Sequence, residues 1–233
     1  TRRMLAEGLR GFVNPGEIVA LPAVLGIDNH SEVLADFKKI LGAEVFEIAS
    51  LPPCVPGMRL NNKLVATAKN ERVDYVLGSK VTGCTVADGK VVSVTVGTAG
   101  AGKEIKADAV VLAGGGFESG ALKLDSHGHL HETILDLPVT MPEGVKEEDL
   151  IHGDYWGSPQ PLFLCGVEVD ETMLVTYQGK PVHSNVYAAG GVIAGATRWQ
   201  EKSGEGIALG SAIKAADAIL SSVGAGAATK ERN

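Results

Sequence analysis

The chain has 233 residues, of which 45% are hydrophobic and 21% are charged, a composition ordinary for a globular protein. Its formal net charge of −7, without any long run of Lys and Arg, argues against a nucleic-acid-binding surface. Cys54, Cys84 and Cys165 form no C-x-x-C pair and no apolar run reaches about 18 residues, so we expect reduced thiols, no iron–sulfur cluster and no membrane helix.

The first part of the chain predicts a β-α-β arrangement. Residues 17–24 and 45–50 are short β-branched runs typical of strands, and a helix is expected between them. Asp28 or Ser31 could cap its start, and Gly42 would end it. Because parallel neighbours need a crossover helix, the two strands should pair in parallel. The apolar residues that share one face of this helix are Val33, Leu34, Phe37, Ile40 and Leu41.

The middle of the chain changes character at residues 50–58, whose three prolines predict a hinge or a crossing into another structural unit. A helix should follow to about residue 72, and the alternation over 73–78 predicts a strand. Residues 80–106 then alternate around Asp88–Gly89, which predicts an antiparallel three-stranded meander.

An unbroken apolar run over 109–113 predicts a central strand covered on both faces. Residues 121–180 are less regular, and there we expect loops, short helices, a short strand near 162–169 and side chains that form a site.

Glycines follow this central strand as G-x-G-x-x-x-G, at Gly114, Gly116 and Gly120. The spacing is consistent with dinucleotide binding, but no amphipathic helix, second strand and acidic residue follow it. A glycine turn that simply ends a core strand explains the same residues.

The segment 185–219 is more informative, because a second apolar strand leads through a glycine-rich loop into a helix that begins near Gly204. A helix N-terminus offers free N–H groups and partial positive charge, and Gly204 and Gly206 would let a flat or anionic ligand approach the backbone. Close helix–strand packing explains the alanines of this helix but not the glycines before it.

The order of these segments resembles flavoproteins with the FAD fold of fumarate reductase and glutathione reductase, and in particular a family of flavoprotein subunits of anaerobic glycerol-3-phosphate dehydrogenase. The motifs that carry the resemblance are residues 51–64, 131–139, 153–173 and 185–219. The family opens with a strand, G-x-G-x-x-G and a helix, and residues 1–50 have no such form. We therefore expect the chain to correspond to the C-terminal portion of such a subunit.

The resemblance implies an α/β fold: a partial FAD-binding Rossmann-like sheet with an antiparallel β-meander, plus an α/β cap region. Residues 57–120 and 181–233 would be flavin-binding segments, and residues 1–56 and 121–180 would form the cap and substrate region. An acidic residue that many relatives place after the last strand is missing here, where Gly191 and Val192 follow Gly190. The residues implied in cofactor binding are Gly114, Gly115, Gly116, Gly190, Gly191, Gly204, Gly206, Ile207 and Ala208.

The implied reaction is oxidation of glycerol 3-phosphate to dihydroxyacetone phosphate with FAD or FMN as cofactor. Electrons would pass through other subunits of a membrane-associated complex toward quinone. The location would be cytoplasmic, and partner subunits could hold the protein at the inner face of the cell membrane. The isolated fragment is expected to be inactive. Alternatives are a noncatalytic scaffold or electron-transfer subunit that keeps a flavoprotein fold, and a related flavin-dependent reductase.

Three side chains are candidates for catalysis within these motifs. Arg59 and Arg198 could bind a phosphate, although each could equally be a structurally paired arginine, and Lys202 is a weaker candidate. His131 could act as general base, although a histidine that caps or pairs within a loop is the commoner case.

Two other features of these segments have competing interpretations. His127, His129 and His131 form H-x-H-x-H, but the other ligand spacings of a closed zinc site are missing and no metal is expected. Tyr155 and Trp156 could wall a flavin or substrate, or simply pack under a loop.

Overall fold

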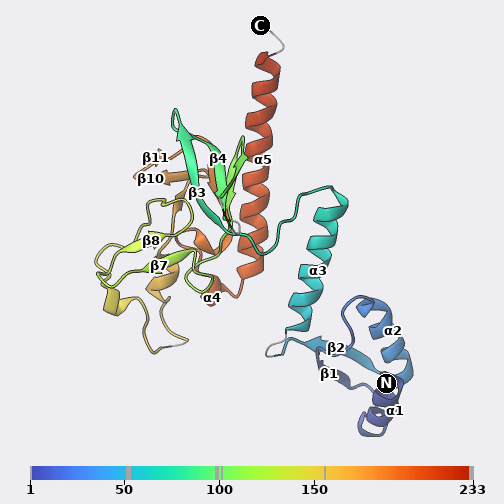
Figure 1. Ribbon diagram of the computed structural model, residues 1–233. Helices are drawn as coiled ribbons and strands as arrows, with labels where there is room; N and C mark the ends of the chain where they lie inside the picture. The colour runs from blue at the N-terminus through green and yellow to red at the C-terminus, as the bar shows by residue number, and fades with distance from the viewer. Residues whose placement is uncertain (1, 51–53, 98–99, 101, 155, 231–233) are drawn as a thin grey trace. The chain divides into compact units, whose positions relative to one another are not determined.

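The computed structural model describes residues 2–50, 54–97, 100, 102–154 and 156–230, with side chains to residue 222. The chain forms two compact units, an N-terminal unit of Thr1–Leu77 and a C-terminal unit of Gly78–Asn233 (Figure 1). The unit boundary cuts through the predicted flavin-binding segment 57–120. That division concerns function rather than compactness, and it stays a prediction. No helix in the described part of the chain is both long enough and apolar enough to span a membrane.

The N-terminal unit has the predicted β-α-β order, and its two strands pair in parallel. The crossover helix starts after Asn29, rather than after either predicted cap residue. It ends as predicted at Gly42, which has a left-handed φ of 81° and donates its N–H to the Lys38 carbonyl. The elements are α1 (Arg2–Leu9), η1 (Arg10–Phe12), β1 (Ile18–Pro22), α2 (His30–Leu41), β2 (Glu44–Ile48) and α3 (Val55–Asn70).

The core of this unit lies on one face of the two-stranded sheet, where α1 and α2 cover it. The opposite face is apolar and exposed, with Phe46 and Ile48 each about half accessible. The strand predicted over residues 73–78 is wrong: the chain after α3 has no regular structure there. Alternating residues alone do not make a strand, because a strand needs a partner for its backbone N–H and C=O groups. The buried core residues are Ala6, Leu21, Leu25, Phe37, Leu41 and Val45.

The C-terminal unit begins with three antiparallel strands in the order β3-β4-β5, as residues 80–106 predict. The turn between the first two is at Asp88–Gly89, where both residues have positive φ (51° and 71°). Two such residues are what a tight hairpin turn requires. The strands are β3 (Val81–Ala87), β4 (Lys90–Val96) and β5 (Lys103–Lys106).

A parallel pair, β6 (Val110–Leu112) and β12 (Val186–Ala188), forms the centre of the C-terminal unit. Every residue of β12 is buried, as the apolar run predicts. In β6, however, Val111 is 41% exposed, so the prediction that this strand is covered on both faces is wrong. The buried side chain of Asn185 ties the pair to β4: it accepts the Val91 N–H and donates to the carbonyls of Val91 and Asp108.

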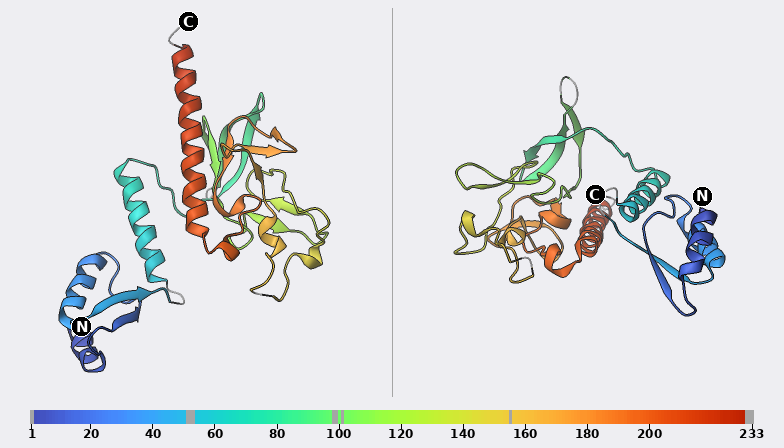
Figure 2. Two further views of the ribbon diagram at one scale, coloured as in Figure 1. Left: turned by 180° about the vertical axis from the view of Figure 1, so that it is seen from behind. Right: turned by 90° about the horizontal axis from the view of Figure 1, so that it is seen from below.

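Short elements and loops fill residues 121–180, as expected. The predicted strand over 162–169 is instead a 3-10 turn followed by a two-residue strand, because Pro161 opens the turn. The long helix α5 runs without a break in each view (Figure 2). The elements are β7 (Leu122–Leu124), β8 (Leu130–Glu132), η2 (Glu147–Asp149), η3 (Pro161–Leu164), β9 (Glu168–Val169), β10 (Val175–Tyr177), β11 (Lys180–Pro181), η4 (Gly190–Val192), α4 (Arg198–Glu201) and α5 (Gly204–Lys230).

Candidate functional site

Two glycine loops meet at the carboxyl ends of the parallel strands. Gly114–Gly116 follows β6, and Gly190–Gly191 follows β12. A Cβ placed on Gly116 would lie 3.0 Å from the Gly191 carbonyl oxygen, so the two loops approach at a distance that a side chain would obstruct. Ligands of open parallel sheets bind at this end of the strands. The structure therefore brings together two glycine groups that are about 75 residues apart in the sequence, at a place suited to a ligand.

The start of α5 is held against the second loop by the buried Ser211. The Gly190 N–H donates to the Ser211 hydroxyl over 2.9 Å, and that hydroxyl donates to the Ile207 carbonyl. Gly190 has a φ of 75°, and a Cβ on it would lie 3.8 Å from the Cβ of Ala208. The predicted cofactor residues on α5 are thus adjacent to the loop after β12. Sequence reasoning missed Ser211, whose only signal is a hydroxyl in an alanine-rich helix.

Arg198 lies between the two glycine loops. Its Nη1 donates to the Gly191 carbonyl over 3.2 Å, and its Nη2 is paired with Glu118. Its guanidinium also lies 5.1 Å from the centre of the Phe163 ring. A Cβ on Gly191 would collide with Nη1, so a side chain at that position would displace the arginine. Arg198 therefore connects the loops, and the sequence did not reveal its partners Glu118 and Phe163.

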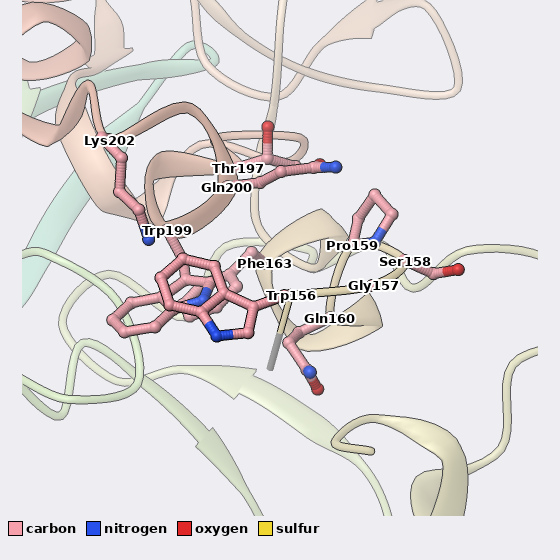
Figure 3. A pocket seen from close by; sticks show the side chains of 10 residues that line it. All are labelled: Trp156, Gly157, Ser158, Pro159, Gln160, Phe163, Thr197, Trp199, Gln200 and Lys202. Carbon is pink, nitrogen blue, oxygen red and sulfur yellow. The ribbon is translucent and has the colours of Figure 1, made fainter. Parts of the chain in front are cut away.

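A small pocket lies beside Arg198, and we call it the Trp156/Trp199 pocket (Figure 3). Its volume is about 110 Å³. The Nζ of Lys202 is 4.1 Å from the centre of the Trp199 ring and 5.2 Å from that of Trp156. Tyr155, the other aromatic residue predicted here, is outside the described residues. The lining residues are Trp156, Gly157, Ser158, Pro159, Gln160, Phe163, Thr197, Trp199, Gln200 and Lys202.

Arg59 lies in the N-terminal unit, within a buried ion pair. Its Nη1 is 2.7 Å from Glu47, its Nε donates to the Gly26 carbonyl, and its side chain is 16% exposed. Burial opposes ionisation of Glu47, but the Arg59 guanidinium and the N–H groups of Leu25 and Val24 outweigh it and keep the Glu47 pKa below its usual value. These contacts describe a paired arginine, in a different unit from Arg198.

His131 lies on β8, with its Nε2 3.0 Å from Asp125. Asp125 also accepts the backbone N–H groups of His127 and His129. The N–H of His129, followed by the His131 ring, holds the Asp125 pKa well below its usual range. His131 is half exposed and is not among the residues lining the Trp156/Trp199 pocket. Among the described residues, no three His, Cys, Asp or Glu side chains are grouped so that they could hold a metal ion.

The residue after His131 explains part of the 131–139 motif. Glu132 is 2% exposed and accepts the backbone N–H groups of Ile134 and Leu135 at 2.7 and 2.8 Å. A third N–H, from Leu137, lies 3.3 Å away. The carboxylate thus fixes the loop after β8, since it satisfies N–H groups that would otherwise be buried without partners. A lone carboxylate in an apolar stretch is the signal that sequence reasoning passed over.

Comparison with known proteins agrees with the resemblance seen in the sequence. Residues 1–207 match the family described as FAD binding domain. A probable anaerobic glycerol-3-phosphate dehydrogenase subunit from Halobacterium salinarum is 30% identical over 95% of this chain and 51% of its own length. The corresponding anaerobic glycerol-3-phosphate dehydrogenase subunit from Yersinia pestis is 28% identical over 94% of this chain and 50% of its own. The chain thus spans about half the length of these relatives.

One solved structure, a thioredoxin reductase of T. acidophilum, is 18% identical over 94% of this chain and 56% of its own. Its TM-score is 0.21, too low to support an argument.

Proposed function

Because the chain belongs to the FAD binding domain family, we propose that it is part of a flavin-dependent dehydrogenase that oxidises glycerol 3-phosphate to dihydroxyacetone phosphate. The family indicates FAD as the cofactor. The substrate is taken from the names of relatives that match nearly all of this chain. Those names also describe a subunit, which supports the proposal that further subunits receive the electrons, pass them toward quinone and hold the protein at the membrane.

One observation carries this proposal: the two glycine loops and the start of α5 meet at the carboxyl ends of β6 and β12. The residues present fit one side of FAD, since a Cβ on Gly116 or Gly191 would fill the backbone surface that the loops form. When bound, FAD supplies the acceptor for the hydride that leaves the alcohol carbon.

The residues of the chain would bind and orient the reactants. The N–H groups of the first turn of α5 offer donors and partial positive charge to an anionic part of the cofactor. Arg198 keeps the loops after β6 and β12 in contact through Gly191 and Glu118. His131, oriented by Asp125, remains the proposed general base, because a neighbouring carboxylate fixes the tautomer and orientation of the ring. Arg59 remains a proposed phosphate ligand only if it can leave Glu47.

Titration of the protein with FAD tests the cofactor site. Gly191→Ala should weaken FAD binding, because the new methyl group collides with Arg198. Gly153→Ala is the matched control, since nothing lies within 4 Å of a Cβ at that position. If the two variants bind FAD equally well, the glycine loops do not hold the cofactor.

Anaerobic addition of glycerol 3-phosphate to the FAD-loaded protein tests the reaction. The expected result is loss of the visible absorption band of oxidised flavin. If FAD stays bound and oxidised, also with the partner subunits present, the noncatalytic scaffold is supported and the dehydrogenase proposal is wrong.

A further inference from the structure

We propose that the Trp156/Trp199 pocket binds the phosphorylated polyol substrate, with Lys202 contacting the phosphate and the two indole rings contacting the carbon chain. The inference rests on the proposed function for the identity of the ligand. It assigns the phosphate to a residue that sequence reasoning ranked below Arg59 and Arg198.

The size of the pocket selects a small ligand. Sites for drug-sized molecules and cofactors measure about 300–1,000 Å³. At about 110 Å³, this pocket is too small for a flavin ring system or a dinucleotide. A three-carbon phosphate ester is of the right order.

The charge of the lining selects an anion. Lys202 brings an ammonium group to the pocket, and none of the ten lining residues, all within the described part of the chain, is Asp or Glu. Arg59 and Arg198, the other two candidates for the phosphate, do not belong to this lining. Lysine binds phosphate as a point charge, and Ser158 and Gln200 add groups able to hydrogen-bond hydroxyls. The lining therefore matches a ligand with one anionic end and a polyol body.

The backbone at Lys202 supports a role for its side chain. The residue has a φ of 53° and ψ of 30°, a left-handed conformation that costs stability for any residue except glycine. It ends α4 and leads into α5, and its Nζ points toward the indole rings (Figure 3). A glycine or asparagine would make the same turn more easily, so a lysine here suggests that the ammonium group is used.

The pocket also lies next to the proposed cofactor site. Phe163 lines the pocket and at the same time contacts the Arg198 guanidinium, which donates to the Gly191 carbonyl. Thr197 and Trp199, the neighbours of Arg198 in the sequence, line the pocket as well. A ligand here would therefore be separated from the glycine loops only by the Phe163–Arg198 contact.

Tryptophan fluorescence offers a direct test. The chain has two tryptophans, and both line this pocket, so selectively excited emission reports on this site alone. Titration with glycerol 3-phosphate in the absence of FAD should change the emission saturably. Glycerol and inorganic phosphate should each bind at least about tenfold more weakly, because each lacks one of the two parts that the pocket contacts.

Lys202→Gln should weaken binding of glycerol 3-phosphate about tenfold or more, since a charge-assisted contact is lost. The control Lys214→Gln removes the same charge from an exposed position on α5 and should bind as the unchanged protein does. Unaltered far-UV circular dichroism of both variants would show that the fold is intact.

Three results would overturn the inference: no change in emission, equal affinities of the two lysine variants, or inorganic phosphate binding as tightly as glycerol 3-phosphate. These failures are distinguishable from failure of the proposed function. Reduction of bound FAD that is insensitive to Lys202→Gln would refute the pocket and keep the dehydrogenase. Saturable emission changes that depend on Lys202, without reduction of FAD, would keep the pocket and refute the dehydrogenase.

Discussion

Replacing Glu47 by glutamine should destabilise the N-terminal unit strongly. Glutamine keeps the shape of the side chain and an oxygen that can accept the N–H groups of Val24 and Leu25, both 2.7 Å from the carboxylate. It removes the negative charge opposite Arg59, while His30 Nε2 also lies 2.7 Å from the same carboxylate. The substitution therefore isolates the charge of a side chain that is 5% exposed.

The expected loss is about 3 kcal/mol, because removal of one partner from a buried ion pair costs about 3–5 kcal/mol and Arg59 retains some contact with water. A unit of this length has a total stability of about 4–12 kcal/mol. The loss should also depend on pH. A carboxyl whose folded-state pKa is lowered contributes stability above its unfolded pKa, and that contribution disappears as the pH falls through the lowered value. The two proteins should thus become equally stable in acid.

Hydrogen exchange followed by mass spectrometry is the suitable assay, since both tryptophans lie in the C-terminal unit and do not report on this one. Peptides from β1 through β2 should exchange on the order of 100-fold faster in Glu47→Gln at neutral pH. The control Glu44→Gln, on the same strand but 70% exposed, should change exchange little. Equal exchange of the two variants would refute the assigned role of the buried pair.

Three further predictions concern the C-terminal unit. Asn185→Ala should cost about 2–4 kcal/mol in urea unfolding, because its three buried hydrogen bonds are lost; a midpoint equal to that of the exposed Ser184→Ala would contradict this. Gly166→Ala should cost about 1–3 kcal/mol, because a Cβ there would lie 2.5 Å from the backbone of Val192 and Ala194; an unchanged melting temperature would be the opposing result. Asp125→Asn should speed exchange of the turn amides between β7 and β8 at neutral pH, and the difference should vanish as acid protonates Asp125 through its lowered pKa; equal amide exchange at neutral pH would argue against it.

Local patterns were reliable where they combined several independent signals. The helix over 30–41 has both an apolar face and a terminal glycine, and the hairpin at Asp88–Gly89 has two residues that tolerate positive φ between alternating runs. Residues 73–78 had alternation alone, and they form no strand. The difference is physical, since the successful segments had a buried face or a defined turn to fix them, whereas 73–78 had no pairing partner.

The candidate site was only partly accessible from the sequence. The glycines after the two parallel strands were recognisable, because bare backbone at a strand end is visible in the sequence itself. The partners Glu118 and Phe163 of Arg198 were not, since they are 80 and 35 residues away from it in the chain. The Trp156/Trp199 pocket likewise joins residues 156–163 to 197–202.

The sequence by itself thus determined the order of strands and helices, the two glycine loops and the likeness to flavoproteins, because periodicity, turn chemistry and motif order are properties of neighbouring residues. Only the tertiary structure decided what surrounds each charge. It buried Arg59 against Glu47, placed Arg198 between the glycine loops and brought Lys202 to two indole rings. The role of a charged side chain depends on its neighbours in space, and those neighbours come from distant parts of the chain.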